Sequence, residues 1–252
     1  MITSTAEPGA HCAPDHLSHS QIQTFAGSCA RKWHYEKVVR APRERVGAAL
    51  IVGIALHQVL AAANEAALTG EAYDAAARFV AAWKAAISEA GAPVHFGADD
   101  ADDLIAKGRA LAAAYTPPPG IIGVEQPFSL VLAPDLPPVE GRIDLVRRTA
   151  SSDLAIADLK TSSSRQLTDT HAVEMQLALY DIAYPATHHE VIVLGKLKTP
   201  TVTVQPITPW PRRQLINHYR EVYAAMSAGV RYAVRGWQCE SCPFADRCRK
   251  DG

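Results

Sequence analysis

A run of three prolines and a glycine, Pro117 to Gly120, divides the sequence into two parts with different hydrophobic patterns. Before the run, apolar residues recur at three- and four-residue spacing, which is typical of amphipathic helices. After it, short segments rich in β-branched residues are separated by turn residues, which is typical of strands. Because proline lacks an amide hydrogen and has a fixed φ, the run ends the helical part. We therefore expect a helical N-terminal part followed by a sheet.

The order of the expected elements favours one mixed sheet. In chain order, the sequence predicts a helix from Leu17 and helices over about 47–68, 71–90 and 99–115, strands over 121–132, 139–148 and 154–160, a helix over 170–184, strands over 190–198 and 202–207, and a last helix over about 209–232. Such an order suits an α/β fold in which a mixed central sheet is flanked by helices.

The sequence contains no clear linker, so we expect a single domain after a loose tail. The tail is residues 1–16, which are small and polar and contain proline and glycine. The expected domain, 17–252, consists of a helical region (17–116), a sheet core (121–207) and a last helix with a cysteine loop (208–252).

Composition and charge exclude several classes of protein. The 252 residues have a formal net charge of −1, and 48% of them are hydrophobic, so the chain can bury a sizeable core. The near-neutral charge argues against a uniformly basic protein that coats duplex DNA. The apolar stretch 48–60 is broken by His57 and is shorter than a membrane span of ~20 residues. The N-terminus lacks the pattern of a signal peptide, so we expect a soluble, cytoplasmic protein with no membrane association.

Two acidic residues and a lysine lie near the ends of two neighbouring predicted strands. Asp144 lies in V-E-G-R-I-D-L-V, and Asp158 and Lys160 lie in L-A-I-A-D-L-K-T. Since side chains alternate along a strand, Asp158 and Lys160 point to one face while Leu159 points to the other. Carboxylates suit Mg²⁺ or Mn²⁺, which orient a phosphate and lower the pKa of a bound water. A lysine beside them can hold that water and stabilise the charge that develops on phosphorus.

The segments G-R-I-D and A-D-L-K-T together resemble the PD-(D/E)XK nucleases, and in particular their RecB-type branch. The resemblance implies a restriction-endonuclease-like core in which Asp144 and Asp158 bind a divalent metal ion and Lys160 is catalytic. It also implies that the backbone carbonyl of Leu159 is a further metal ligand.

Three further segments are similar to segments of the same branch. In G-I-A-L-H, the resemblance implies that His57 completes the metal shell. In M-Q-L-A-L-Y-D, Gln176 and Tyr180 would brace the site and contact the DNA. Glu125 in V-E-Q-P-F lies on the first strand, where related nucleases often carry a glutamate that binds a metal ion or supports its ligands. All these motifs follow the family's order over roughly residues 17–250.

The cysteines form a second candidate site. Cys239, Cys242 and Cys248 lie close together, and Cys29 precedes Cys239 by 210 positions. Five cysteines, with Cys12 expected to be free, do not make a pure disulfide framework. The arrangement resembles the iron–sulfur subset of the RecB-type branch, which includes the AddB nuclease domain and CRISPR-adaptation nucleases. The resemblance implies a structural [4Fe–4S] cluster held by the other four cysteines, with zinc or disulfides as the alternatives.

The resemblance implies a divalent-metal-dependent nuclease that hydrolyses DNA, as an exonuclease on single strands or ends, in repair, recombination or CRISPR adaptation. The sequence has no G-x-x-x-x-G-K-[ST] motif, so unwinding would come from a partner such as a helicase, a recombinase or a CRISPR integrase. A non-catalytic DNA-end-binding scaffold subunit is the alternative, but it would be expected to lack an acid or the lysine. A zinc-stabilised nucleic-acid binder is a third interpretation, which fits the near-neutral charge poorly.

Overall fold

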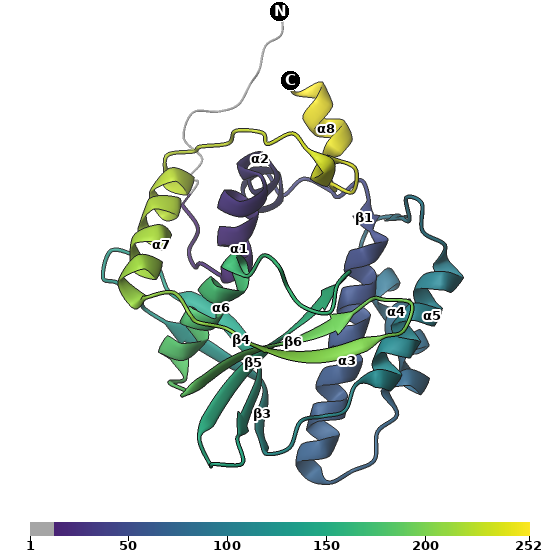
Figure 1. The fold of residues 1–252 in the computed structure, drawn as a ribbon. Coiled ribbons are helices and arrows are strands. Elements are labelled where there is room, and N and C mark those ends of the chain that lie inside the picture. Colours follow the sequence, from purple (N-terminus) through teal and green to yellow (C-terminus); the bar gives the residue numbers. More distant parts are fainter. Residues whose placement is uncertain (1–12) are drawn as a thin grey trace, which may run out of the picture.

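The computed structural model describes residues 13–252, and a five-stranded mixed sheet forms its centre. The strand order is β3–β4–β5–β6–β7, in which β5 and β6 are parallel and all other neighbours are antiparallel. The strands are β3 (Ile121–Leu130), β4 (Val139–Arg148), β5 (Leu154–Ser162), β6 (His188–Gly195) and β7 (Thr201–Pro206). Helices flank this sheet, so the predicted α/β fold class is confirmed (Figure 1).

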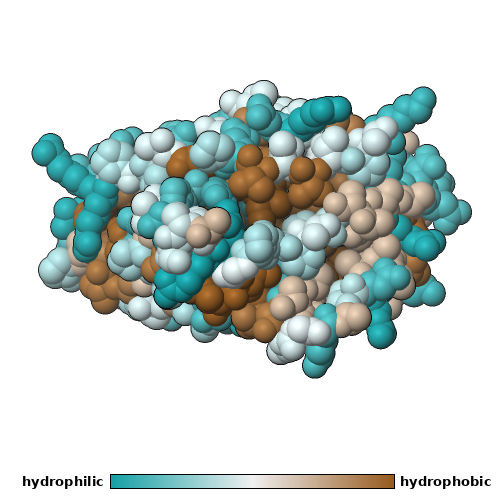
Figure 2. Space-filling model, turned by 60° about the horizontal axis from the view of Figure 1, so that its bottom comes forward, coloured by the Kyte–Doolittle hydropathy of each residue, from teal (hydrophilic) through white to brown (hydrophobic). Residues whose placement is uncertain are grey.

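Three helices, α3 (Ala48–Thr69), α4 (Ala75–Glu89) and α5 (Ala101–Ala114), pack on one face of the sheet. Their buried side chains form one core cluster with Leu145 and Leu159 of the sheet. The carboxylates of Asp74 and Asp100 accept hydrogen bonds from backbone N–H groups in the first turns of α4 and α5, which fixes where these helices begin. The alanine-rich surface of this side forms the pale-brown area on the right of Figure 2.

The opposite face of the sheet is covered by α1 (His19–Ile22), α2 (Ala30–Trp33), α6 (His171–Ala183) and α7 (Arg212–Ser227). Large apolar side chains of these helices, such as Trp33 and Leu177, form a second core cluster with Ile156 and Val193 of the sheet. Figure 1 shows α1, α6 and α7 on the side of the sheet away from α4 and α5. Both faces of the central strands β5 and β6 are therefore covered, as their apolar sequences require.

The N-terminal helical segment is interrupted, whereas the sequence predicted regular helical spacing from Leu17 through Trp33. A π-helical turn, η1 (Gln23–Ser28), separates α1 from α2, and a second π-helical turn, η2 (His34–Val38), follows α2. Between η1 and α2, Cys29 has an extended backbone with φ −161° and ψ 116°. At this break, the Cys29 sulfur accepts a hydrogen bond from the Val234 backbone N–H at 3.5 Å.

The C-terminal segment also differs from its prediction. Helix α7 ends at Ser227 rather than near Tyr232, because Gly229 adopts φ 73° and the Val230 N–H closes the helix on the Ala225 carbonyl. The cysteine segment, expected to be a loop, contains a 3₁₀ turn, η3 (Trp237–Cys239), and the short helix α8 (Ala245–Lys250). A small parallel pair, β1 (Val46–Gly47) and β2 (Val94–His95), was not expected either. Most of the predicted tail, with Cys12, lies outside the described residues.

Helix α3 begins and ends within one residue of the bounds predicted for it, about 47–68. Its 22 residues are long and apolar enough to cross a membrane by length and composition alone. Half of its most apolar window is buried inside the protein, where Ile51, Ala55 and Leu56 pack in the core cluster shared with the sheet. A core helix passes the same test of composition, so we interpret α3 as part of the core.

Candidate metal centre

The two acids predicted from the strand pattern meet where β4 and β5 separate. The two strands pair from Arg148 opposite Leu154 to Leu145 opposite Ala157, and Asp144 and Asp158 are the next residues beyond the last pair. Both are buried, with 7% and 0% of their surface exposed. The Leu159 backbone N–H donates to Oδ2 of Asp144 across the gap, at 2.8 Å. The fork of the sheet therefore brings two carboxylates together in a buried position.

Helix α3 brings His57 to this fork. The Nε2 atom of His57 lies 2.9 Å from Oδ2 of Asp144, and its Nδ1 atom lies 3.3 Å from Oε1 of Glu125. One ligand atom from each of the three residues lies within 4.8 Å of the other two. The hydrogen bond to Asp144 and then the nearby Glu125 carboxylate raise the pKa of His57 to about 10. The imidazole is thus held between two carboxylates, and together they offer nitrogen and oxygen ligands at one point.

Glu125 reaches the site through an unusual backbone conformation. It lies on β3 opposite Asp144, between the pairs Val124–Leu145 and Gln126–Ile143. Its φ is 48°, in the left-handed region that residues other than glycine rarely adopt. Such strained residues are concentrated at functional sites. The strain fits a glutamate whose side chain is needed at this point.

Asp158 and Lys160 form the second half of the centre. The Nζ atom of Lys160 lies 2.8 Å from Oδ2 of Asp158, yet both carboxylate oxygens are buried without a well-aligned hydrogen bond. Burial raises the pKa of Asp158 to about 7, although the charge of Lys160 opposes that shift. Burial lowers the pKa of Lys160, but the Asp158 carboxylate outweighs it, so the net pKa is above the usual value. Asp158 therefore has unused capacity to bind a cation.

Two residues of α6 hold Lys160 in place. Its Nζ donates to Oε1 of Gln176 at 3.0 Å, and Nε2 of Gln176 donates to the Tyr180 hydroxyl at 2.7 Å. Tyr180 is only 3% exposed and packs edge-on against Phe128, with ring centroids 5.9 Å apart. The pair therefore braces the lysine from within the protein. At this burial, the Tyr180 side chain does not present a surface to DNA.

One neighbour of the site, His19 of α1, was missed by the sequence analysis. Burial, followed by the positive charges of Lys160 and His218, lowers the pKa of His19 to about 3. This histidine is therefore neutral and adds no positive charge beside Lys160. The local sequence pattern does not indicate that His19 lies near Lys160, because packing between distant elements brings them together.

The four cysteines of the second candidate site line one cavity of about 550 Å³. Cys29 is buried, and Sγ of Cys239 lies 3.7 Å from the same Val234 residue that contacts Cys29. Nη1 of Arg31 lies 3.9 Å from Sγ of Cys248. Among the described residues that line this cavity, none is acidic. Four are basic, namely Arg31, Lys32, Arg235 and Arg249. In Figure 1, α8 at the C-terminus lies close to α2.

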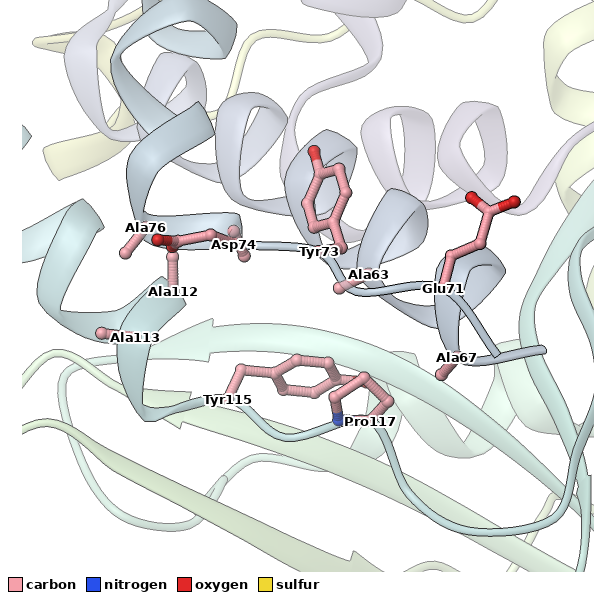
Figure 3. Close-up of a pocket in the computed structure, with 11 residues that line it drawn as sticks. Ala63, Ala67, Glu71, Tyr73, Asp74, Ala76, Ala112, Ala113, Tyr115 and Pro117 are labelled. Carbon is pink, nitrogen blue, oxygen red and sulfur yellow. The ribbon is translucent and has the colours of Figure 1, made fainter. Parts of the chain in front are cut away.

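Another cavity of about 550 Å³ lies near the C-terminal end of α3 (Figure 3). Alanines make up much of its wall, and the Tyr115 ring lies beside Pro117 (Figure 3). Two charged residues line this cavity among the described residues, Glu71 and Asp74, and both are acidic. Because like charges repel, this cavity is a poor candidate for binding nucleic acid.

Comparisons with known proteins agree with the fold. The family model described as the PD-(D/E)XK nuclease superfamily matches residues 16–249. A crystal structure from Eubacterium rectale, of a protein named "putative exonuclease", has a TM-score of 0.55 and 15% identity, and the match covers 100% of this chain and 94% of that chain. The structure of SSO0001 has a TM-score of 0.47 and 12% identity, covering 94% and 86%, and is too distant to add support. No curated protein sequence matches the chain significantly.

Proposed function

The chain belongs to the PD-(D/E)XK nuclease superfamily, and on this basis we propose that it is a divalent-metal-dependent nuclease that hydrolyses phosphodiester bonds of DNA. One observation carries the proposal. Ligand atoms of His57, Glu125 and Asp144 converge within 4.8 Å, beside the buried carboxylate of Asp158, which contacts Lys160 but accepts no well-aligned hydrogen bond. Since burying several carboxylates close together is costly unless positive charge compensates them, such a cluster is expected where a cation binds.

The residues present fit Mg²⁺ or Mn²⁺. Asp144, Asp158 and Glu125 offer the carboxylate oxygens that these hard ions prefer, and His57 offers a nitrogen. The Leu159 carbonyl is proposed as a further ligand. When bound, the ion would neutralise charge on the phosphate and supply a water of lowered pKa. The carboxylates of Asp144 and Glu125 favour the protonated form of His57 when no metal ion is bound. Metal binding would therefore require His57 to release a proton.

Lys160 is the proposed catalytic cation. Its contacts with Asp158 and Gln176 fix the Nζ atom at the edge of the carboxylate cluster. From there the ammonium group can hold the attacking water and stabilise the negative charge that develops as the phosphorus–oxygen bond breaks. Because the Gln176–Tyr180 pair already orients the lysine, little reorganisation is needed during the reaction.

We propose that the substrate is single-stranded DNA or a DNA end and that the enzyme is a RecB-type exonuclease in repair, recombination or CRISPR adaptation. The similar Eubacterium rectale protein carries the name of an exonuclease. A helicase, recombinase or CRISPR integrase would supply unwinding. A DNA-end-binding scaffold without catalysis would not need the acids and the lysine, which are all present, with Asp144 in contact with His57 and Asp158 in contact with Lys160.

For the cysteine cavity we propose a [4Fe–4S] cluster held by Cys29, Cys239, Cys242 and Cys248. A cavity of about 550 Å³ is larger than a single zinc ion requires, and basic side chains around it suit an anionic thiolate cluster. The cluster would act structurally. It would tie the break between η1 and α2 to the C-terminal segment.

The experiment that tests the proposed function is a digest of labelled DNA by anaerobically purified protein. Single-stranded and duplex oligonucleotides are incubated with Mg²⁺, with Mn²⁺ or with a chelator. We expect cleavage of the single strand with either ion and none with the chelator. Intact DNA under all conditions would refute the nuclease proposal. DNA binding without cleavage would favour the scaffold alternative.

A further inference from the structure

We propose that the N-terminal half of α3 forms a subsite for the unpaired base next to the scissile phosphate. The inference rests on the proposed nuclease function and identifies residues that would restrict it to single strands. A cavity of about 370 Å³ adjoins the metal centre, because His57 and Lys160 form part of its wall. This volume lies within the range of about 300–1,000 Å³ that is usual for ligand sites. The rest of the wall is almost entirely apolar, with Leu50, Gly53, Ile54, Leu56, Leu60, Leu159, Thr161 and Leu194.

The apolar part of the wall and His57 share one face of α3. Leu50, Gly53, Ile54 and His57 are spaced i, i+3, i+4 and i+7, which places them together on a helix surface. Leu50 is 55% exposed and Ile54 is 36% exposed. We call Leu50, Gly53 and Ile54 the apolar shelf. The shelf is therefore open to solvent and lies directly beside a group of charged side chains.

The absence of a side chain at Gly53 leaves open space between Leu50, Ile54 and His57. A Cβ atom added at this position would meet nothing within 4 Å, and its φ is not in the left-handed region. Glycine in a helix interior is less stable than alanine, and neither backbone conformation nor close packing requires it here. What the missing side chain provides is open volume beside His57.

An unpaired nucleotide fits this arrangement. Its phosphate would lie at the charged centre, and the face of its base would pack on the apolar shelf, as bases do on apolar side chains in other nucleic-acid sites. In a duplex both faces of each base are covered by stacking, so the shelf favours single strands. Apolar contact does not distinguish between bases, so we expect little sequence preference.

The subsite ends at Leu50. This residue also lines the neighbouring cavity of about 740 Å³, which includes the side chain of Trp237. Both signs of charge line that cavity, with the basic Lys32 and Arg43 and the acidic Glu36, Asp99 and Glu240. Mixed charge does not favour a phosphate backbone.

Replacing Gly53 by leucine tests the subsite, because the Cβ of the new side chain would meet nothing within 4 Å and the remaining atoms would extend into the open volume. In the full-length protein with Ca²⁺ in place of Mg²⁺, fluorescence anisotropy gives the Kd for labelled single-stranded oligothymidine. We expect Gly53→Leu to raise this Kd by at least about tenfold, the loss of one base contact. The melting temperature should be unchanged or higher, because leucine is the better helix former. Mn²⁺ affinity should not change.

Two controls make the result specific. Leu50→Ser should also weaken binding to the single strand, whereas Leu68→Ser, at a similarly exposed leucine at the other end of α3, should not. If Gly53→Leu binds the single strand within about twofold of the wild type, or if the wild type does not bind it, the subsite is refuted. If the wild type binds but cleaves nothing with Mg²⁺ or Mn²⁺, the proposed function fails while the loss of binding in Gly53→Leu still supports the subsite.

Discussion

Oδ2 of Asp144 lies 2.9 Å from Nε2 of His57, although the two residues are 87 positions apart. This contact joins the helical region of the chain to the sheet at the fork between β4 and β5. The same oxygen accepts the Leu159 N–H. A single carboxylate atom thus fixes the relative positions of α3, β4 and β5 around the candidate metal centre.

Replacing Lys160 with alanine should abolish most cleavage while leaving DNA affinity nearly intact. In the proposed mechanism the lysine stabilises charge that develops only in the transition state, so the rate should fall on the order of 10²-fold or more. Single-turnover cleavage of a labelled oligonucleotide measures the effect. Lys84→Ala, at an exposed position on α4, is the control and should cleave normally. Cleavage by Lys160→Ala at the wild-type rate would exclude this role.

Replacing Asp158 with asparagine should stabilise the metal-free protein at neutral and alkaline pH. Burial raises the pKa of Asp158 from its ordinary value of 3.8 to about 7, so the folded state binds its proton more tightly than the unfolded state does. The free energy of unfolding of the wild type therefore falls as pH rises from about 4 to about 7, whereas that of the variant, which has no carboxyl group at this position, does not. Thermal unfolding with a chelator should show a difference that is largest above about pH 7 and disappears near pH 4. A variant that melts below the wild type at about pH 8 would contradict this account.

Replacing His57 with alanine should weaken Mn²⁺ binding, and Glu125→Gln should do so as well, because both side chains lie within ligand distance of Asp144. Loss of one ligand or of its supporting partner reduces metal affinity by roughly 10–100-fold. Isothermal titration with Mn²⁺ provides the measurement. His188→Ala, at an exposed end of β6, serves as the matched histidine control. Equal affinity in His57→Ala and His188→Ala would remove His57 from the ligand set.

Replacing any of the four cavity cysteines with serine should destabilise the protein before it affects the chemistry. The proposed cluster would cross-link Cys29 to the C-terminal segment and close almost the whole chain, which on the chain-entropy model would contribute roughly 5 kcal/mol. We expect loss of visible absorbance, lower yield and a lower melting temperature. Cys12→Ser, outside the described residues, should change none of these. A colourless, zinc-containing wild-type protein after anaerobic purification would replace the cluster with a zinc site.

The sheet was largely predictable from the sequence, because strand periodicity is a local property. The alternation around Leu159 placed Asp158 and Lys160 on one face, and the structure shows these two side chains in contact. The break at Cys29 and the early end of α7 were not predictable, since tertiary contacts and the positive φ of Gly229 determine them.

The candidate site depended on more than local pattern. Nothing in the spacing of His57 indicates that α3 crosses the fork of the sheet, and only the family resemblance pointed to it. The direction of the Glu125 side chain depends on a left-handed backbone conformation that its sequence neighbours do not signal. The open volume at Gly53 is a property of packing, and the sequence shows only a glycine in a helical segment.

The central claim is that His57, Glu125, Asp144 and Asp158 form the site of a divalent ion. Anomalous diffraction at the manganese edge, from crystals grown with Mn²⁺, locates the ion directly. The account predicts one strong peak between the His57 imidazole and the Asp144 and Asp158 carboxylates, and its absence in crystals of Asp158→Asn. A wild-type peak elsewhere, or none at the fork of β4 and β5, would contradict it.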